Sequence, residues 1–211
     1  MATLEAMLAS PDQSIRLNGA LAAGTYPEPR FIEILVAQCA IETDFFVRDT
    51  LSWALLRNDQ DAVVERLIPE LKSENIQAKT QAIHTLTKIG DKKNYSLITN
   101  EMLLDLDDFV ASTAWRAASV LVPDGEKDAL VKTLITQLAR GDSDVQFALT
   151  RFLCAMGESI VGPLSEASNA PKEEVRMHAQ FTLMRLKEMQ LEFAKKSTVG
   201  GEGFEPPTSS V

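Results

Sequence analysis

The sequence predicts an all-α protein whose fold is an α-solenoid of about six helix pairs. The residue types support this prediction, because Ala, Leu, Glu, Gln and Lys are common and alternating runs of β-branched residues are scarce. A second observation is a pattern that returns every 30 to 35 residues along most of the chain. The helices of one short repeat cannot bury their apolar faces alone, so a regular repeat of this length indicates a stacked array.

The repeated pattern has six copies, each with an aliphatic residue at its fourth position. The copies are DQSIRLNGALA (12–22), DFFVRDTLSWA (44–54), NIQAKTQAIHT (75–85), DDFVASTAWRA (107–117), DSDVQFALTRF (142–152) and KEEVRMHAQFT (172–182). Small or apolar residues follow four and seven positions later, as Leu51 and Ala54 follow Val47. This i, i+4, i+7 stripe is one face of a helix, so each copy predicts the second helix of a repeat.

Five of the six copies begin with a residue suited to cap a helix, because its short side chain offers an oxygen to the first N–H groups. These residues are Asp12, Asp44, Asn75, Asp107 and Asp142. The sixth copy begins with Lys172, so we expect Asn169 and Pro171 to start that helix. Shorter apolar-periodic segments predict the first helices of the repeats, over residues 3–9, 29–40, 61–72, 95–105, 126–139 and 160–168.

The pattern Asp-x-x-Val-Arg-x-x-Ala-x-x-Ala resembles the second helix of HEAT-like repeats, in particular the short bacterial kind named after phycobilin lyases. DFFVRDTLSWALLR, QAIHTLTKIGD and STAWRAASVLVP look like stretches of small actinobacterial HEAT-repeat proteins. The resemblance covers residues 3–193 and implies a right-handed superhelical stack with a binding or scaffolding role. Copies five and six depart from it, with Gln146 in place of the usual Arg and Lys172 at the cap, as terminal repeats often do.

The resemblance also implies that the second helices line the concave side of the stack. Positions two and six after the aliphatic residue point away from the buried stripe. In the middle of the array, polar and aromatic residues occupy these positions or lie one turn beyond. They are Asp49, Trp53, His84, Lys88, Arg116 and Arg151. Neighbouring helices pack roughly 9–10 Å apart, so these side chains would reach one extended ligand.

This set predicts a binding surface for a protein or peptide with acidic groups. Arg116 and Arg151 would pair with carboxylates or phosphates, Trp53 would anchor by stacking, and Asp49 would orient a donor. Each residue also has a structural interpretation, in which Trp53 packs on a neighbouring helix and His84 is merely exposed or hydrogen-bonded. A solvated face on a purely structural scaffold is therefore the alternative to binding.

Two further features of the pattern are expected to be structural. One basic residue follows the aliphatic column in four copies, and in HEAT-like stacks such a residue bonds to the capping acid of an adjacent repeat. These residues are Arg16, Arg48, Lys79 and Arg176. Trp115 lies at the edge of the predicted core, so we expect it to pack inside the array.

No motif in the sequence indicates catalysis, a metal or a cofactor, so we predict a non-enzymatic protein. Gly-rich phosphate loops and G-x-S-x-G are absent, and His84 and His178 lack other metal ligands at suitable spacing. Cys39 and Cys154 lie in apolar stretches, which indicates reduced packing residues. The alternative is an enzyme on a HEAT-like scaffold that acts on a damaged DNA base or a tetrapyrrole. Asp49, Trp53 and Arg116 resemble the acid, aromatic and basic types of HEAT-like DNA glycosylases.

Charge and hydropathy exclude other classes. A formal net charge of −9 disfavours nucleic acid, because phosphate polymers repel an acidic chain. The sequence contains no signal-peptide pattern and no apolar window of membrane-spanning length, so we expect a cytoplasmic protein with no membrane segment.

The end of the chain differs in composition from the array. We expect one array over residues 3–193 and a disordered tail over 194–211, because this tail is rich in Gly, Ser, Thr and Pro. GFEPPTSS within it resembles translation through a transfer-RNA gene, which leads to the hypothesis of a read-through product. An ordinary linker or a short peptide ligand is the alternative.

Overall fold

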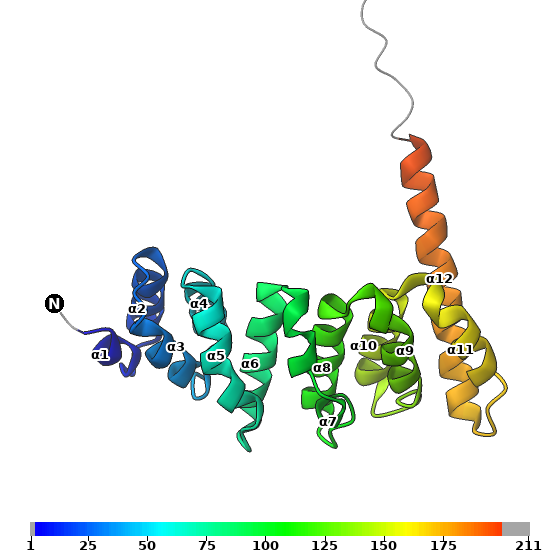
Figure 1. Cartoon of the computed structure of the whole chain (residues 1–211), viewed down its shortest axis with the longest axis horizontal. Helices are drawn as coiled ribbons and strands as arrows, with labels where there is room; N and C mark the ends of the chain where they lie inside the picture. The colour runs from blue at the N-terminus through cyan, green and yellow to red at the C-terminus, as the bar shows by residue number, and fades with distance from the viewer. Residues whose placement is uncertain (1–2, 200–211) are drawn as a thin grey trace, which may run out of the picture. The chain divides into compact units, whose positions relative to one another are not determined.

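The computed structural model describes residues 3–199, and the regular structure in that range is helical with no strand (Figure 1). First and second helices alternate, as the sequence predicts. The second helices are α2 (Gln13–Thr25), α4 (Phe45–Leu56), α6 (Ile76–Ile89), α8 (Asp108–Leu121), α10 (Ser143–Cys154) and α12 (Glu173–Val199). The first helices are α1 (Leu4–Leu8), α3 (Phe31–Cys39), α5 (Gln60–Leu71), α7 (Asn100–Leu103), α9 (Lys127–Ile135) and α11 (Val161–Ala167). The predicted all-α solenoid class is therefore confirmed.

Three of the first helices are accompanied by a 3₁₀ turn. These turns are η1 (Lys92–Leu97) before α7, η2 (Asp124–Glu126) before α9 and η3 (Gly157–Ile160) before α11. The predicted first helix over residues 95–105 is thus split in two, since η1 ends at Leu97 and Thr99 caps α7 by accepting a hydrogen bond from the N–H of Met102.

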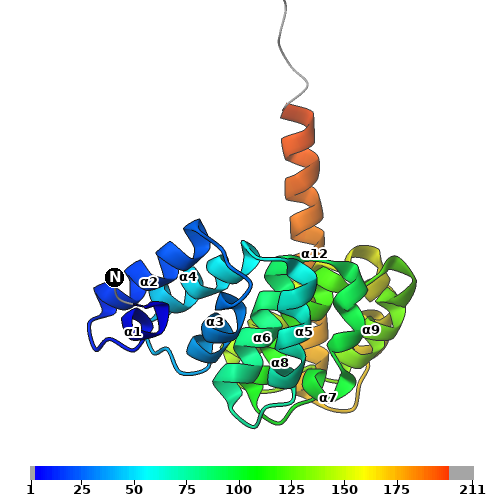
Figure 2. The same cartoon turned by 60° about the vertical axis from the view of Figure 1, so that its left-hand side comes forward.

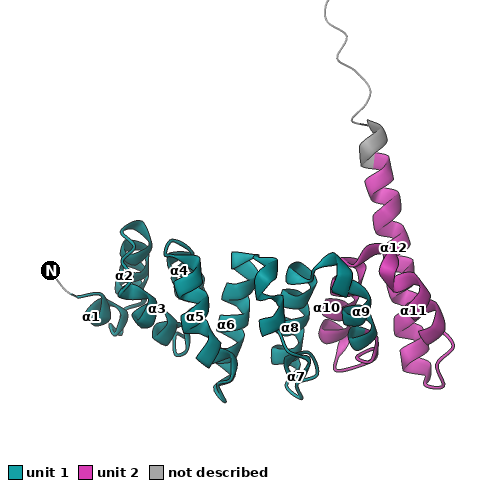
Figure 3. Cartoon of the chain, in the orientation of Figure 1, with its two compact units in different colours: residues 1–134 teal, residues 135–211 magenta. Residues whose placement is uncertain are grey.

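The chain divides into two compact units, residues 1–134 and 135–211 (Figure 3). In the first unit α2, α4, α6 and α8 pack against one another in that order, and each also packs on its own first helix (Figures 1 and 2). In the second unit α12 packs on α10 and α11. Within each unit, helices that are neighbours in the repeat pattern are thus neighbours in the packing.

The aliphatic column forms the core of the first unit, where Val47, Ala78 and Val110 are buried. Ile15 occupies the same column in α2 but stays 43% exposed. The reason is that α1 has only five residues and its side chains lie over Gly19, one turn further along α2. The first copy therefore has too short a partner helix to cover the start of its stripe.

The predicted N-caps are confirmed in all five copies that carry Asp or Asn. A side-chain oxygen of Asp44, for example, accepts a hydrogen bond of 3.0 Å from the backbone N–H of Val47. The expectation for the sixth helix was wrong, because α12 begins at Glu173, directly after Lys172. The side-chain amide of Asn169 instead donates to the carbonyl of Ser165 at the end of α11.

Helix α12 continues to Val199, so the predicted boundary at residue 193 falls inside it. The residues beyond Leu191 include Glu, Ala and Lys, which are good helix formers. The rest of the predicted tail, residues 200–211 with the GFEPPTSS segment, lies outside the described residues. None of the helices described within residues 3–199 combines the length and the apolar character needed to cross a membrane.

Both cysteines are buried and free, as the sequence predicts. Burial raises the pKa of the Cys39 thiol to about 12, and it also raises the pKa of the Cys154 thiol. A thiol with so high a pKa carries almost no thiolate at neutral pH, which fits a packing residue.

Candidate functional site

Four of the six predicted site residues form one polar group on the second helices of the first unit. The Nζ of Lys88 on α6 lies 2.6 Å from the Oδ1 of Asp49 on α4, so these two side chains form an ion pair. His84 lies one turn before Lys88. Burial lowers the pKa of His84, and the positive charges of Lys88 and Arg116 lower it further, against a smaller opposing effect of Asp49. The predicted proximity of Asp49, His84, Lys88 and Arg116 is therefore present.

These four residues differ in how far intramolecular contacts satisfy them. Asp49 and Lys88 neutralise each other, and the lowered pKa of His84 favours its neutral form at neutral pH. Arg116 is exposed and has no salt-bridge partner among the residues that the structure describes. The positive charge of this group is thus concentrated on Arg116.

Trp53 lies on the same helix as Asp49 and packs over α2. A Cβ atom built on Gly24 of α2 would lie only 2.1 Å from the Cζ3 atom of Trp53, so the indole ring occupies the space above this glycine. The ring remains 39% exposed. Trp53 therefore packs on the neighbouring repeat and still offers part of its face to solvent, which combines the two interpretations made from the sequence.

Two other residues of the pattern are buried. Thr80 occupies position two of its copy, where an outward direction was expected, but it is only 2% exposed. Its hydroxyl donates to the carbonyl of Ile76 inside α6, which removes the cost of burying it. Trp115 is completely buried and its Nε1 donates to the carbonyl of Leu103 over 2.8 Å, as expected for a structural residue.

The sixth predicted site residue, Arg151, belongs to the second unit and lines a groove between α10 and α12. The part of this groove beside Arg151 and Arg185 has a volume of about 360 Å³. The adjoining part, of about 400 Å³, contains the ring of Phe147, which meets Phe181 edge-to-face at 5.5 Å. The Arg151 guanidinium lies over the ring of Phe152 and, within residues 3–195, pairs with no carboxylate. Arg151 thus presents a cation beside an apolar groove.

The basic residues expected to bond to capping acids instead bond mainly to their own loops. In three copies the guanidinium donates to the two carbonyls just before the capping position. The pairs are Arg16 with Ser10 and Pro11, Arg48 with Glu42 and Thr43, and Arg176 with Ala170 and Pro171. The expectation was wrong in detail: these guanidiniums donate to carbonyls of their own loops, while the capping carboxylates accept N–H groups of their own helices.

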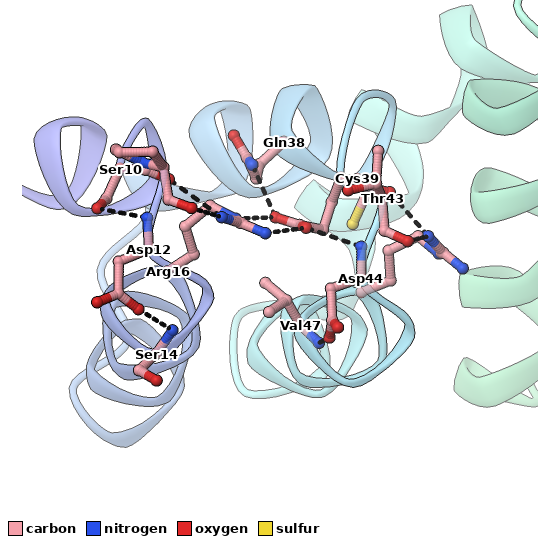
Figure 4. Close-up of polar contacts among 12 residues, drawn as sticks. Ser10, Asp12, Ser14, Arg16, Gln38, Cys39, Thr43, Asp44 and Val47 are labelled. Atoms are coloured by element: carbon pink, nitrogen blue, oxygen red, sulfur yellow. Dashed lines mark hydrogen bonds and ion pairs between the residues drawn. The ribbon is translucent and has the colours of Figure 1, made fainter.

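An acid two residues before the cap makes the contact between repeats, and sequence reasoning missed it. Arg16 on α2 forms two hydrogen bonds with the carboxylate of Glu42, at 2.8 and 2.9 Å. Gln38 and the backbone N–H of Asp44 donate to the same carboxylate (Figure 4). Lys79 reaches Asp105, in the same position of the fourth repeat, at 3.6 Å. The recurring S-x-D, E-x-D, S-x-N and D-x-D triplets were the available signal.

A buried histidine holds the second unit together and was also missed. The Nδ1 of His178 accepts a hydrogen bond from the backbone N–H of Ala139, and its Nε2 lies 3.1 Å from the carbonyl of Gln146 and 3.0 Å from the hydroxyl of Thr150. Ala139 has a positive φ of 65° although it is not glycine. The imidazole therefore stabilises a backbone conformation that an alanine rarely adopts.

We expect acid to destabilise the second unit through His178. Burial lowers its pKa, against a smaller raising effect of the Gln146 carbonyl, so the unfolded chain binds a proton more readily than the folded one. The contribution of His178 is complete above the unfolded pKa of about 6.5 and is lost as pH falls through the lower folded pKa. Denaturant unfolding between pH 7.5 and 5 measures this loss. The free energy of unfolding should depend less on pH in His178→Gln than in the unmodified chain. An unchanged pH dependence in that variant contradicts the assignment.

The geometry does not point to a metal centre. No three His, Cys, Asp or Glu side chains are grouped as possible metal ligands anywhere in the part of the chain that the structure describes. The chain matches no protein-family model and no curated protein.

Two solved structures resemble the fold. One is the crystal structure of an engineered protein, with 22% identity and a TM-score of 0.47, over 88% of this chain and 95% of that chain. The other is a designed armadillo repeat protein, with 15% identity and a TM-score of 0.45, over 87% of this chain and 98% of that chain. The description of this chain as a helical-repeat solenoid rests on its own alternating helix pairs.

Proposed function

We propose that this chain is a non-enzymatic HEAT-like module that binds an acidic protein or peptide segment on its second helices. The observation that carries the proposal is the state of Arg116 and Arg151. Both are exposed, and neither has a carboxylate partner within residues 3–195. Other arginines of this chain, such as Arg16 and Arg66, are engaged by carboxylates. Exposed guanidiniums without a carboxylate partner favour a ligand with carboxylates, and the ring of Phe147 beside Arg151 favours apolar side chains in that ligand.

Each residue has a role in this proposal that follows from its contacts. Arg116 supplies a bidentate donor, and the exposed part of the Trp53 ring supplies apolar contact area. Asp49 is paired with Lys88, so it repels an acidic ligand less strongly than a free carboxylate would. His84 adds no charge while it is neutral. In the second unit, Arg151 would act in the same way beside Phe147.

An enzyme is less well supported, because the acid and the aromatic residue of the glycosylase-like set have intramolecular partners. Asp49 is paired with Lys88 and Trp53 is packed on Gly24. A cytoplasmic location and a relation to the bacterial phycobilin-lyase type of HEAT repeat are part of the proposal. They are supported by the repeat pattern, the two free cysteines and the lack of a signal-peptide pattern, and the net charge of −9 disfavours nucleic acid as the partner.

We expect Arg116→Glu to weaken binding of acidic peptides at least tenfold, because the variant replaces an attractive guanidinium with a repulsive carboxylate. The measurement is an array of fifteen-residue peptides of graded acidic and aromatic content, followed by fluorescence anisotropy of the best binders. Arg30→Glu is the matched control, since it changes the charge equally at an exposed residue already paired with Glu28. Equal affinity in both variants, or no peptide that binds, would overturn the proposal.

A further inference from the structure

A row of large apolar side chains is exposed where the chain enters α4, α6 and α8. The members flank the capping residues Asp44, Asn75 and Asp107, and between 44% and 98% of each is exposed. We call this set the apolar edge: Ile41, Phe45, Phe46, Ile76, Leu104, Leu106 and Phe109. Phe45 and Phe46 contact each other edge-to-face with ring centroids 5.7 Å apart. Residues of the apolar edge thus occupy the same position in three successive repeats.

The loops that carry the apolar edge lie side by side. The Nε2 of Gln77 at the start of α6 donates to the carbonyls of Cys39 and Glu42, and the side chain of Asn75 donates to the carbonyl of Ala40. Lys79 in the next turn reaches Asp105 in the loop before α8. These contacts join the three loops along one edge of the first unit, the lower edge in Figure 1. The loops that carry the apolar side chains are therefore neighbours along this edge.

The core uses the aliphatic column, such as Val47 and Val110, and the helix starts are fixed by the capping residues. Loop entries of this kind usually carry polar residues. A group of seven exposed apolar side chains is larger than the scattered exposure of an ordinary surface, and such patches mark interaction sites.

The charges around the apolar edge are predominantly negative. Residues 9–16, 40–48, 73–79 and 104–110 contain seven acidic residues, which are Asp12, Glu42, Asp44, Glu74, Asp105, Asp107 and Asp108. The same segments contain three bases, Arg16, Arg48 and Lys79. Glu42 is buried in its pair with Arg16 and Asp105 is paired with Lys79, so these two acids do not add to the exposed charge. Asp12, Asp44, Glu74 and Asp107 are at least partly exposed and leave a negative rim beside the apolar groups, which repels anionic lipid and an identical edge of a second copy.

We infer that the apolar edge binds a basic amphipathic segment of a partner protein, in which apolar side chains alternate with lysine or arginine. The apolar side chains of such a segment would cover the edge, and its cations would meet the acidic rim. The inference is independent of the proposed function, because it concerns different residues, a different side of the first unit and a ligand of opposite charge.

The test uses a sixteen-residue amphipathic helix of Leu and Lys, and a matched helix of Leu and Glu, in fluorescence anisotropy at physiological salt. We expect the basic helix to bind at least tenfold more tightly than the acidic helix. The double variant Phe46→Ser/Phe109→Ser should weaken binding of the basic helix at least tenfold. These substitutions leave the charge of the chain unchanged, so a loss cannot come from weaker general attraction to an acidic protein.

The control is Val120→Ser/Met184→Ser, which removes two other exposed apolar side chains, 47% and 48% exposed, away from the edge. It should bind the basic helix as the unmodified chain does, and so should Arg116→Glu, which separates this inference from the proposed function. Circular dichroism and denaturant unfolding verify that the edge variant is folded. Equal binding by the edge and control variants overturns the inference. So does tighter binding to anionic phosphatidylglycerol vesicles than to the basic helix.

Discussion

Glu42→Ala is expected to lower the free energy of unfolding by about 3–5 kcal/mol, because it removes the carboxylate partner of Arg16, whose side chain is only 14% exposed. Glu42 is almost completely buried and accepts hydrogen bonds from Arg16, Gln38 and the backbone N–H of Asp44. The variant loses the ion pair between the first two repeats and one backbone hydrogen bond together. Denaturant unfolding at pH 7 measures the change.

The matched control is Glu28→Ala, which breaks a pair with Arg30 in which both side chains are exposed. Pairs of that kind contribute at most about 1 kcal/mol, so the control should change stability little. Equal effects of the two substitutions would contradict the assigned role of Glu42.

We also expect the Glu42 carboxylate to make the protein less stable in acid. Burial would raise the pKa of Glu42, but hydrogen bonds from Arg16, Asp44 and Gln38 outweigh it and hold the pKa at about 2. A carboxyl group whose pKa is lowered on folding stabilises the native state above its unfolded pKa of about 4.3, and the contribution is lost as pH falls toward 2. The loss should be about 3 kcal/mol at 1.36 kcal/mol per unit, and Glu42→Ala should lack it.

Gly24→Val is expected to lower the free energy of unfolding by about 2 kcal/mol, because the new side chain takes the space of the Trp53 ring. Trp53 cannot stay in place, since even a Cβ atom at this position would lie 2.1 Å from its Cζ3 atom. The ring must move into solvent, so the fluorescence of Trp53 should shift to longer wavelength. Trp115 is fully buried elsewhere and supplies a constant background.

Two further variants isolate this contact. Gly125→Val places the same side chain at a glycine with no heavy atom within 4 Å of its added Cβ, so stability and fluorescence should hardly change. In a Trp53→Ala background, Gly24→Val should cost much less than in the unmodified chain, because the two effects share one cause. An additive double variant would show that Gly24 and Trp53 do not act on each other.

Most of the fold could be predicted because its signals are local. The caps Asp12, Asp44, Asn75, Asp107 and Asp142 act on N–H groups two or three residues away. The i, i+4, i+7 stripe likewise needs only helix geometry. The errors arose where a local signal had a competitor, as when Asn169 bonded to the end of α11 instead of capping α12.

The positions of the candidate site residues could be predicted from the sequence, but their side-chain contacts could not. The repeat register placed Asp49, Trp53, His84, Lys88 and Arg116 on successive second helices, and the structure has them there. The register could not show that Lys88 binds Asp49, 39 residues earlier, or that Thr80 turns inward. Side-chain pairing between repeats depends on helix spacing and rotation, and these are set by contacts along the whole interface.

The sequence by itself determined that this chain is a helical repeat, where five of its second helices begin and which face of each helix is buried at the aliphatic column of most copies, because capping and periodicity act within a few residues. Only the tertiary structure decided how those side chains are used. It paired Asp49 with Lys88, placed Trp53 on Gly24, left Arg116 unpaired and joined the loops of the apolar edge. Each of these outcomes depends on residues far apart in the chain meeting at close range, and no local pattern specifies that distance.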